Sequence, residues 1–193
     1  MVEHEGFAGA SAYRESRQPH GARDRAAWRA GADGERAVGR LLDELADAGV
    51  CAVHDRRMPG TLGNIDHIAI APSGVYVIDA KNYTGHPRVE TSGAGSAVVH
   101  RLYIGRDEHT DLVRAVRRQV RAVAGELAEP SVPVRGILCF VGAEWEVLNG
   151  YLVDGVGVTS TRGVAELLRM PGPLDPVRVD ALQRRVLAAF DPA

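Results

Sequence analysis

The chain has 193 residues, of which 45% are hydrophobic and 25% charged, and its formal net charge is -2. These values are typical of a globular protein, and they exclude one that is basic over its whole surface, although not a local basic patch. No segment approaches the roughly 18 apolar residues of a membrane span, and the first residues carry Glu3 and Glu5 rather than an apolar signal. We therefore expect a cytoplasmic protein without a membrane partner.

The two cysteines, Cys51 and Cys139, lie alone in apolar segments, and the sequence has no Cys-x-x-Cys motif. Structural zinc sites usually bring such cysteines together in pairs. The pattern therefore predicts a reduced compartment and disfavours a zinc site.

The N-terminal part divides into an arm and a helix. Residues 1–21 are rich in Gly, Ser, Arg and Gln without periodicity, and we expect a flexible arm. Apolar residues at helical spacing, from Val38 to Leu45, predict a helix over 22–48 that ends at Gly49.

Short apolar runs and alternating patterns predict the strands, and Pro72, Ser73 and Gly74 predict a hairpin turn between the second and the third. Loops are expected over 54–63 and 82–97. The expected strands cover residues 50–54, 65–71, 75–80, 97–104, 134–141 and 155–159.

Three further helices follow from periodicity and end signals. One is expected over 111–128, with Thr110 as its N-cap. Two C-terminal helices are expected over 161–169 and 176–190, the latter with Asp175 as N-cap before a proline. Because no repeated strand–helix–strand period occurs, we expect a single α/β domain over 22–193, a mixed sheet flanked by helices.

The predicted hairpin brings charged side chains together. Side chains alternate between the faces of a strand, so Asp79 and Lys81 share one face, as do Asp66 and Ile68 on the preceding strand. A two-residue turn or a four-residue loop places Asp66 opposite Asp79, whereas a three-residue loop or a bulge would separate them.

Two adjacent half-buried carboxylates need a cation, or one must hold a proton. Asp66 and Asp79, with water and the Ala80 carbonyl, would suit Mg²⁺ or Mn²⁺. The alternative is a structural ion pair with Lys81. This lysine is the only one among 23 basic residues, which favours a site where the compact ammonium cannot be replaced by a guanidinium.

Two helical residues are polar where the helix should be apolar. Gln119 falls inside the apolar stripe of its helix, and Glu35 lies on the flank of the stripe that includes Val38 and Leu42. A buried glutamine needs partners, which a ligand site or a loop carbonyl could supply. Glu35 is either part of the site or a rim carboxylate near the helix start.

The segments Gly34-Glu35, GNIDHI (63–68) and GVYVIDAKNYTG (74–85) resemble the nuclease-related domain family, which is assigned to the PD-(D/E)xK nuclease-like superfamily. The resemblance covers roughly residues 31–142 and implies a restriction-endonuclease-like mixed β-sheet flanked by α-helices. One departure concerns the second acid, which is Asp79 where the family more often has Glu.

The resemblance also implies roles for the charged residues. Asp66 and Asp79 would bind a divalent metal, and Lys81 would orient or activate the attacking water. Glu35 would match the acid of the first helix, and Gln119 a helical glutamine that follows the core. We therefore expect a Mg²⁺- or Mn²⁺-dependent DNA nuclease, with RNA as an alternative substrate. The other readings are a nuclease fold that binds nucleic acid without turnover, and a structural interaction domain, including a homodimer.

Basic and aromatic side chains are candidates for contacts with phosphates and bases. A run of arginines on a helix is equally consistent with a solvated face. The candidates are Arg56, Arg57, Asn82, Tyr83, Arg88, Arg101, Arg114, Arg117, Arg118 and Arg121.

Overall fold

The computed structural model describes residues 22–61, 63–147 and 150–193, so the arm expected over 1–21 lies outside the described residues. In chain order the elements are α2 (Ala22–Asp43), the 3₁₀ turn η1 (Ala46–Ala48), β1 (Cys51–Arg57), β2 (Asn64–Ala71), β3 (Gly74–Lys81), β4 (Pro87–Ser92), η2 (Gly95–Ala97), β5 (Val99–Ile104), β6 (Asp107–Glu108), α3 (Thr110–Leu127), β7 (Val134–Phe140), β8 (Tyr151–Val153), β9 (Val156–Thr159), α4 (Thr161–Leu168) and α5 (Pro176–Ala189).

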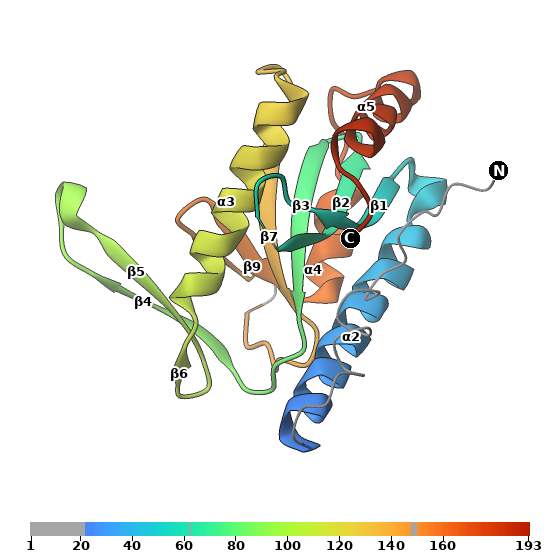
Figure 1. The fold of residues 1–193 in the computed structure, drawn as a ribbon. Coiled ribbons are helices and arrows are strands. Elements are labelled where there is room, and N and C mark those ends of the chain that lie inside the picture. Colours follow the sequence, from blue (N-terminus) through green and yellow to red (C-terminus); the bar gives the residue numbers. More distant parts are fainter. Residues whose placement is uncertain (1–21, 62, 148–149) are drawn as a thin grey trace.

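Six strands form the central sheet, in the order β1-β2-β3-β7-β9-β8, and helices cover both of its faces (Figure 1). The pairs β3–β7 and β7–β9 are parallel and the others antiparallel, so the expected mixed sheet is confirmed. Side chains of α2 and α4 pack on one face and those of α3 and α5 on the other. Strands β4, β5 and β6 form a separate sheet that projects from the body (Figure 1).

The β2–β3 hairpin has the expected register. Ile70 pairs with Val75 and Ile68 with Val77, and the Ala71–Gly74 pair leaves a two-residue turn. Apolar side chains on both faces of β3 are buried, Val77 toward α3 and α5 and Ile78 toward α2 and α4. A slip of one residue would exchange these faces, so burial on both sides fixes the register.

Helix α3 approaches the middle of the sheet at Gly136 of β7. A Cβ atom at this position would lie 2.6 Å from Val116 Cγ1 and 3.0 Å from Val120 Cγ2. Valine side chains are stiff at χ1 and cannot turn away easily. The same helix carries Gln119, so this close approach helps to set the place of Gln119 relative to the sheet.

The substitution Gly136→Ala is therefore expected to destabilise the protein by about 1–3 kcal/mol, the usual effect of overpacking a core. Chemical denaturation would measure the loss. The matched change Gly125→Ala, in α3 where no atom lies within 4 Å of an added Cβ, should leave stability unchanged or raise it by up to about 1 kcal/mol through helix propensity.

The structure differs from the sequence predictions in several details; strands β6 and β8, for example, were not expected. Strand β1 extends to Arg57, where a loop was expected, because its second half pairs with the start of β2. Strand β4 replaces part of the expected loop 82–97, since it is held by pairing with β5 rather than by a buried face. The N-cap of α3 is His109, and the Thr110 hydroxyl instead accepts a hydrogen bond from the Leu102 amide at 3.0 Å.

Candidate nuclease site

The centre of the site lies where β2 and β3 separate. The paired ladder ends at His67–Ile78, and its continuation places Asp66 across from Asp79. The amide of Ala80 donates a hydrogen bond to Asp66 Oδ2 at 3.0 Å. Lys81 forms an ion pair with Asp79, and its Nζ also donates to the Ala80 carbonyl at 3.3 Å. The three residues predicted from the hairpin are therefore brought together.

Helix α2 adds Glu35 to this group. The Asn82 side chain, just beyond β3, donates to the Ala30 carbonyl of α2 at 3.1 Å. Gly34 lies so close to Asn82 that a Cβ atom there would be 3.0 Å from the Asn82 Cβ. These contacts hold α2 against the end of β3, where a cavity of about 430 Å³ is lined by Glu35, Lys81 and their neighbours.

Burial and crowding of acids shift the protonation of this group. Burial, and next the charge of Asp66, raise the pKa of Glu35 from 4.5 to about 8. Burial, and next the charge of Asp79, raise the pKa of Asp66 from 3.8 to about 7. Burial by itself would lower the pKa of Lys81, but the carboxylates of Asp79 and Asp66 outweigh it and hold that pKa above its ordinary value. Lys81 is therefore a fixed cation among carboxyl groups.

Gln119 of α3 reaches the start of β2, as its position in the apolar stripe predicted. It is buried, and its Nε2 donates to the Asn64 carbonyl at 3.2 Å. Its Oε1 is also buried but has no hydrogen-bond partner. The carbonyl of the first residue of β2 thus accepts from the amide nitrogen of Gln119, and the amide oxygen remains as an acceptor.

The oxygen atoms around Asp66 suit a hard divalent cation. Glu35 Oε2 and Gln119 Oε1 are buried oxygens without a hydrogen-bond partner, and burial, and next the neighbouring acids, raise the pKa values of Glu35 and Asp66. Within the described ranges, no three acidic, histidine or cysteine side chains make up a metal site by themselves. Mg²⁺ usually takes one or two carboxylates and completes its shell with water, so the residues present fit it.

The pattern of the sequence agrees with this geometry. The chain matches the nuclease-related domain family over residues 30–141, more than half of its length. The chain belongs to the nuclease-related domain family. The matched region runs from α2 to the end of β7 and contains Glu35, Asp66, Asp79, Lys81 and Gln119. No curated protein and no solved structure matches the sequence significantly.

Two further buried residues lie near the centre of this nuclease-related domain. Asp55 lies opposite Asp66 in the β1–β2 register, and its charge contributes to the raised pKa values of Asp66 and Glu35. Its φ of 50° is unusual for a residue other than glycine. Asp55 was not predicted as a site residue, because it fell in the loop expected over 54–63.

The second is His67, which is completely buried. Its Nδ1 lies 2.9 Å from Nδ1 of His54, whose Nε2 lies 3.2 Å from Asp43 Oδ1. Burial, and next the neighbouring His54, lower the pKa of His67 well below its ordinary value. His67 is therefore neutral. The two ring contacts link it through His54 to Asp43 of α2.

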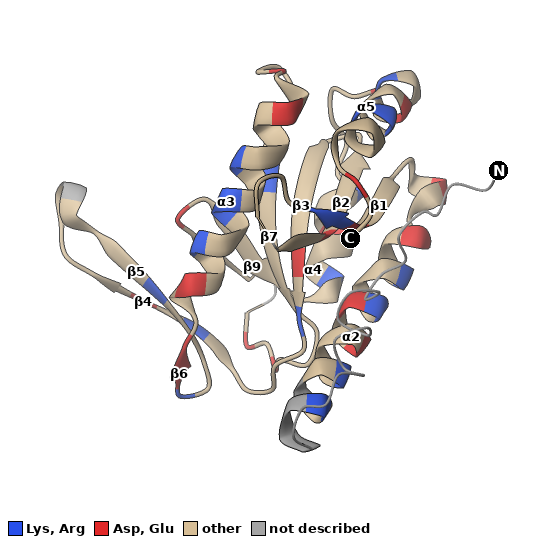
Figure 2. Cartoon of the chain, in the orientation of Figure 1, with Lys and Arg blue, Asp and Glu red and all other residues tan. Residues whose placement is uncertain are grey.

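The arginines proposed to bind phosphate lie in different surroundings. Arg56 is buried and donates to the Phe190 carbonyl at 3.5 Å, and the exposed Arg57 donates to the Pro192 carbonyl at 3.0 Å, so both contact the C-terminal segment. Arg88 pairs with Glu90 and stacks 4.1 Å from the centre of the Tyr103 ring. The arginines of α3 recur along its exposed side (Figure 2); they are Arg114, Arg117, Arg118 and Arg121.

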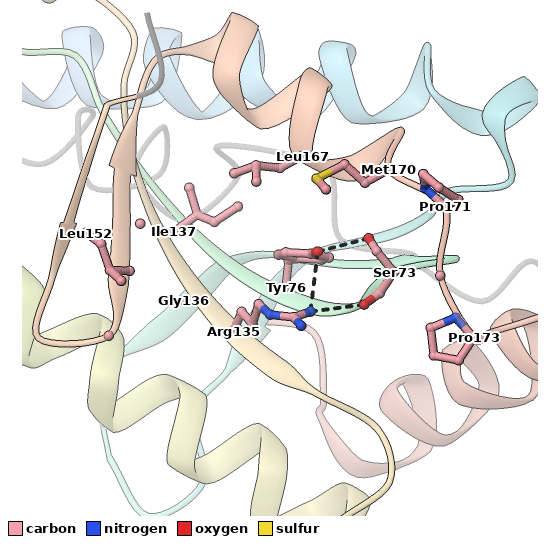
Figure 3. Close-up of a pocket in the computed structure, with 13 residues that line it drawn as sticks. Ser73, Tyr76, Arg135, Gly136, Ile137, Leu152, Leu167, Met170, Pro171 and Pro173 are labelled. Carbon is pink, nitrogen blue, oxygen red and sulfur yellow. Dashed lines mark hydrogen bonds between the residues drawn. The ribbon is translucent and has the colours of Figure 1, made fainter. Parts of the chain in front are cut away.

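A second cavity, of about 420 Å³, lies near the other end of β3 (Figure 3). Its polar contacts are internal: Arg135 Nη1 donates to the Ser73 carbonyl at 3.0 Å, and the hydroxyls of Ser73 and Tyr76 lie 2.9 Å apart. None of its described lining residues is acidic. This cavity therefore lacks the carboxylates that phosphodiester chemistry with a divalent metal requires.

The described parts of the nuclease-related domain contain no helix with the length and apolarity needed to cross a membrane.

Proposed function

We propose that this chain is a metal-dependent nuclease that hydrolyses phosphodiester bonds of DNA. The observation that carries the proposal is the contact of the lone lysine, Lys81, with Asp79 beside Asp66, next to a cavity that Lys81 and Glu35 line. An ion pair needed only for stability would require one acid and would accept arginine.

Asp66, Asp79 and the Ala80 carbonyl are the groups that would hold the metal, with Glu35 as a further carboxylate. When bound, a divalent cation polarises a phosphoryl oxygen and lowers the pKa of a water molecule. The protein contributes the close placement of carboxylates on two strand ends, which hydrogen bonds and backbone pairing keep in position.

Lys81 would act on the charge of the phosphate, and Gln119 on a water molecule. Lys81 keeps its proton, because its pKa is raised, and so it serves as a fixed cation beside the negative charge that develops on the phosphate. Activation of the water by Lys81 as a base would need a neutral amine, which these carboxylates oppose. The free Oε1 of Gln119 can accept a hydrogen bond from a water and orient it.

A panel of labelled DNA and RNA substrates with Mg²⁺, Mn²⁺, Ca²⁺ or EDTA tests this function directly. We expect cleavage of DNA with Mg²⁺ or Mn²⁺ and none with EDTA. Absence of cleavage with every metal and substrate would contradict the proposal.

The variant Asp66→Asn tests metal binding separately from cleavage. Calorimetric titration of Mn²⁺ should show binding to the wild-type protein that is weakened in the variant by at least the roughly 10–100-fold seen when a supporting group is lost. Asp47→Asn, which changes an exposed acid of η1, should bind as the wild type does. Equal affinity of all three proteins would place the metal elsewhere.

One observation favours a second function, a domain that binds nucleic acid without turnover. The Lys81 ammonium already contacts Asp79 and the Ala80 carbonyl, two of the oxygens a metal would use. The site is thus partly neutralised without a metal. DNA binding in the absence of any calorimetric metal signal would support this second function over the first.

A further inference from the structure

An exposed tryptophan lines the cavity that Lys81 also lines. Trp28 of α2 lines this cavity together with Tyr83, which follows β3. Its side chain is 38% exposed and belongs to none of the three apolar clusters formed by the described residues. Tryptophan is highly buried on average, so an indole left at the edge of a charged cavity is available for a ligand.

The part of the cavity wall that Tyr83 forms is held in place by contacts within the protein. The Tyr83 ring centre lies 4.9 Å from that of His109 and 5.8 Å from that of Phe140. The hydrogen bond from Asn82 to the Ala30 carbonyl ties this wall to α2. The spacing between the Trp28 side and the Tyr83 side is therefore set by contacts within the protein and not by a ligand.

The space between these walls has the size of a small-ligand site. Its volume of about 430 Å³ lies within the roughly 300–1,000 Å³ of such cavities. One nucleotide fits this space, whereas a stacked duplex does not. Bases inside a duplex also have both faces covered by their neighbours, and only an unpaired base can present a face to an indole.

We infer that this cavity receives an unpaired nucleotide of single-stranded DNA, whose base stacks on Trp28 while its phosphate lies toward Lys81. This inference rests on the proposed nuclease function and deepens it by naming the form of the substrate. It makes Trp28 a specificity-determining residue that favours single strands and frayed ends over blunt duplex.

Trp28 fluorescence provides a direct test. The chain has two tryptophans, Trp28 and Trp145, so Trp145→Phe leaves Trp28 as the only tryptophan, and excitation at the red edge of the absorption band avoids the tyrosines. Measurements in EDTA keep the DNA intact, and the anisotropy of a labelled oligonucleotide reports binding separately. We expect a saturable change in Trp28 emission with a single-stranded oligonucleotide and none with a blunt hairpin of equal length.

The outcomes separate the inference from the function. Oligonucleotide binding without a change in Trp28 emission, or an equal change with the blunt hairpin, would overturn the inference and leave the nuclease proposal standing. Failure to bind or to cleave any nucleic acid would overturn both.

Gly31 allows the cavity to be filled without changing any charged group. It lines the cavity, and an added Cβ atom would meet nothing within 4 Å. Gly31→Leu should weaken binding of the single strand by about 10-fold, within the range for loss of base stacking. Gly125→Leu is the matched control, because Gly125 is also helical with open surroundings and lies near the C-terminal end of α3, outside the lining of this cavity.

Thermal unfolding must show that both leucine variants fold. Unchanged binding in a folded Gly31→Leu protein, or the same loss of affinity in Gly125→Leu, would overturn the inference.

Discussion

Replacing Lys81 with alanine is expected to lower kcat for DNA cleavage by about 10²–10³-fold, the usual effect of removing one preorganised group that stabilises developing negative charge. The ammonium contacts Asp79 and the Ala80 carbonyl in the wild-type protein, so its charge is held in place before substrate arrives. Single-turnover cleavage of a labelled oligonucleotide would measure the effect. Cleavage by Lys81→Ala at the wild-type rate would contradict the assignment.

Loss of the ammonium also leaves Asp79 without its ionic partner, which is destabilising when the pair is buried. A loss of activity must therefore be separated from a loss of structure. Lys81→Met keeps most of the aliphatic stem, and thermal unfolding shows whether the variant folds. Arg135→Ala removes a cation near the other end of β3, beside the cavity without acids, and should leave cleavage unchanged.

Lys81→Arg tests whether charge alone is sufficient. Arginine keeps the charge but replaces a compact ammonium by a planar fork. The floor of the site offers one carboxylate oxygen and one backbone carbonyl to the ammonium, a geometry that does not match the fork. We expect Lys81→Arg to fold and to remain well below wild-type activity, and wild-type activity would show that the lysine is not chemically required.

The core of the site could be predicted because it rests on local rules. A two-residue turn and strict alternation determine which side chains of β2 and β3 share a face, and the burial of Ile68 and Val77 confirms that register. Gln119 was also predictable, because a polar residue inside an apolar helical stripe must be buried. These inferences use spacing along one element or one hairpin.

The missed features depend on pairing between distant segments. Asp55 and His54 enter the site because the second half of β1 pairs with β2, although this stretch has no apolar run that predicts a strand. Strand β4 is mostly exposed and is defined by its hydrogen bonds with β5. The place of Trp28 in the cavity wall could not be predicted from the sequence, because it depends on how α2 lies against the end of β3.

Metal-free protein is expected to lose stability as the pH rises from about 4.5 to about 8. The pKa of Glu35 is about 8 in the folded state against an ordinary value of 4.5, and that of Asp66 is about 7 against 3.8. In this interval the folded protein holds protons that the unfolded chain has released, so the free energy of unfolding falls with rising pH. The stabilisation that comes from protonated Glu35 and Asp66 is fully present below about pH 4 and is lost above about pH 8.

Glu35→Gln removes one of these titrating groups and keeps the shape of the side chain. At pH 8 the variant should be more stable than metal-free wild type by about 1–3 kcal/mol, the scale for a buried polar group left unsatisfied. Its stability should also vary less with pH. Urea denaturation at pH 5, 6.5 and 8 measures both effects, and the exposed Glu44→Gln is the matched control.

Addition of Mg²⁺ should reverse the loss at pH 8 in the wild-type protein. A ligand at 100 times its Kd stabilises the folded state by about 2.7 kcal/mol, and Glu35→Gln should gain less because it contributes one negative charge fewer. A wild-type stability that is flat from pH 5 to pH 8, or an equal gain from Mg²⁺ in both proteins, would contradict this account. The carboxylate repulsion that lowers the stability of the metal-free fold is, on this argument, the same free energy that favours binding of a divalent cation.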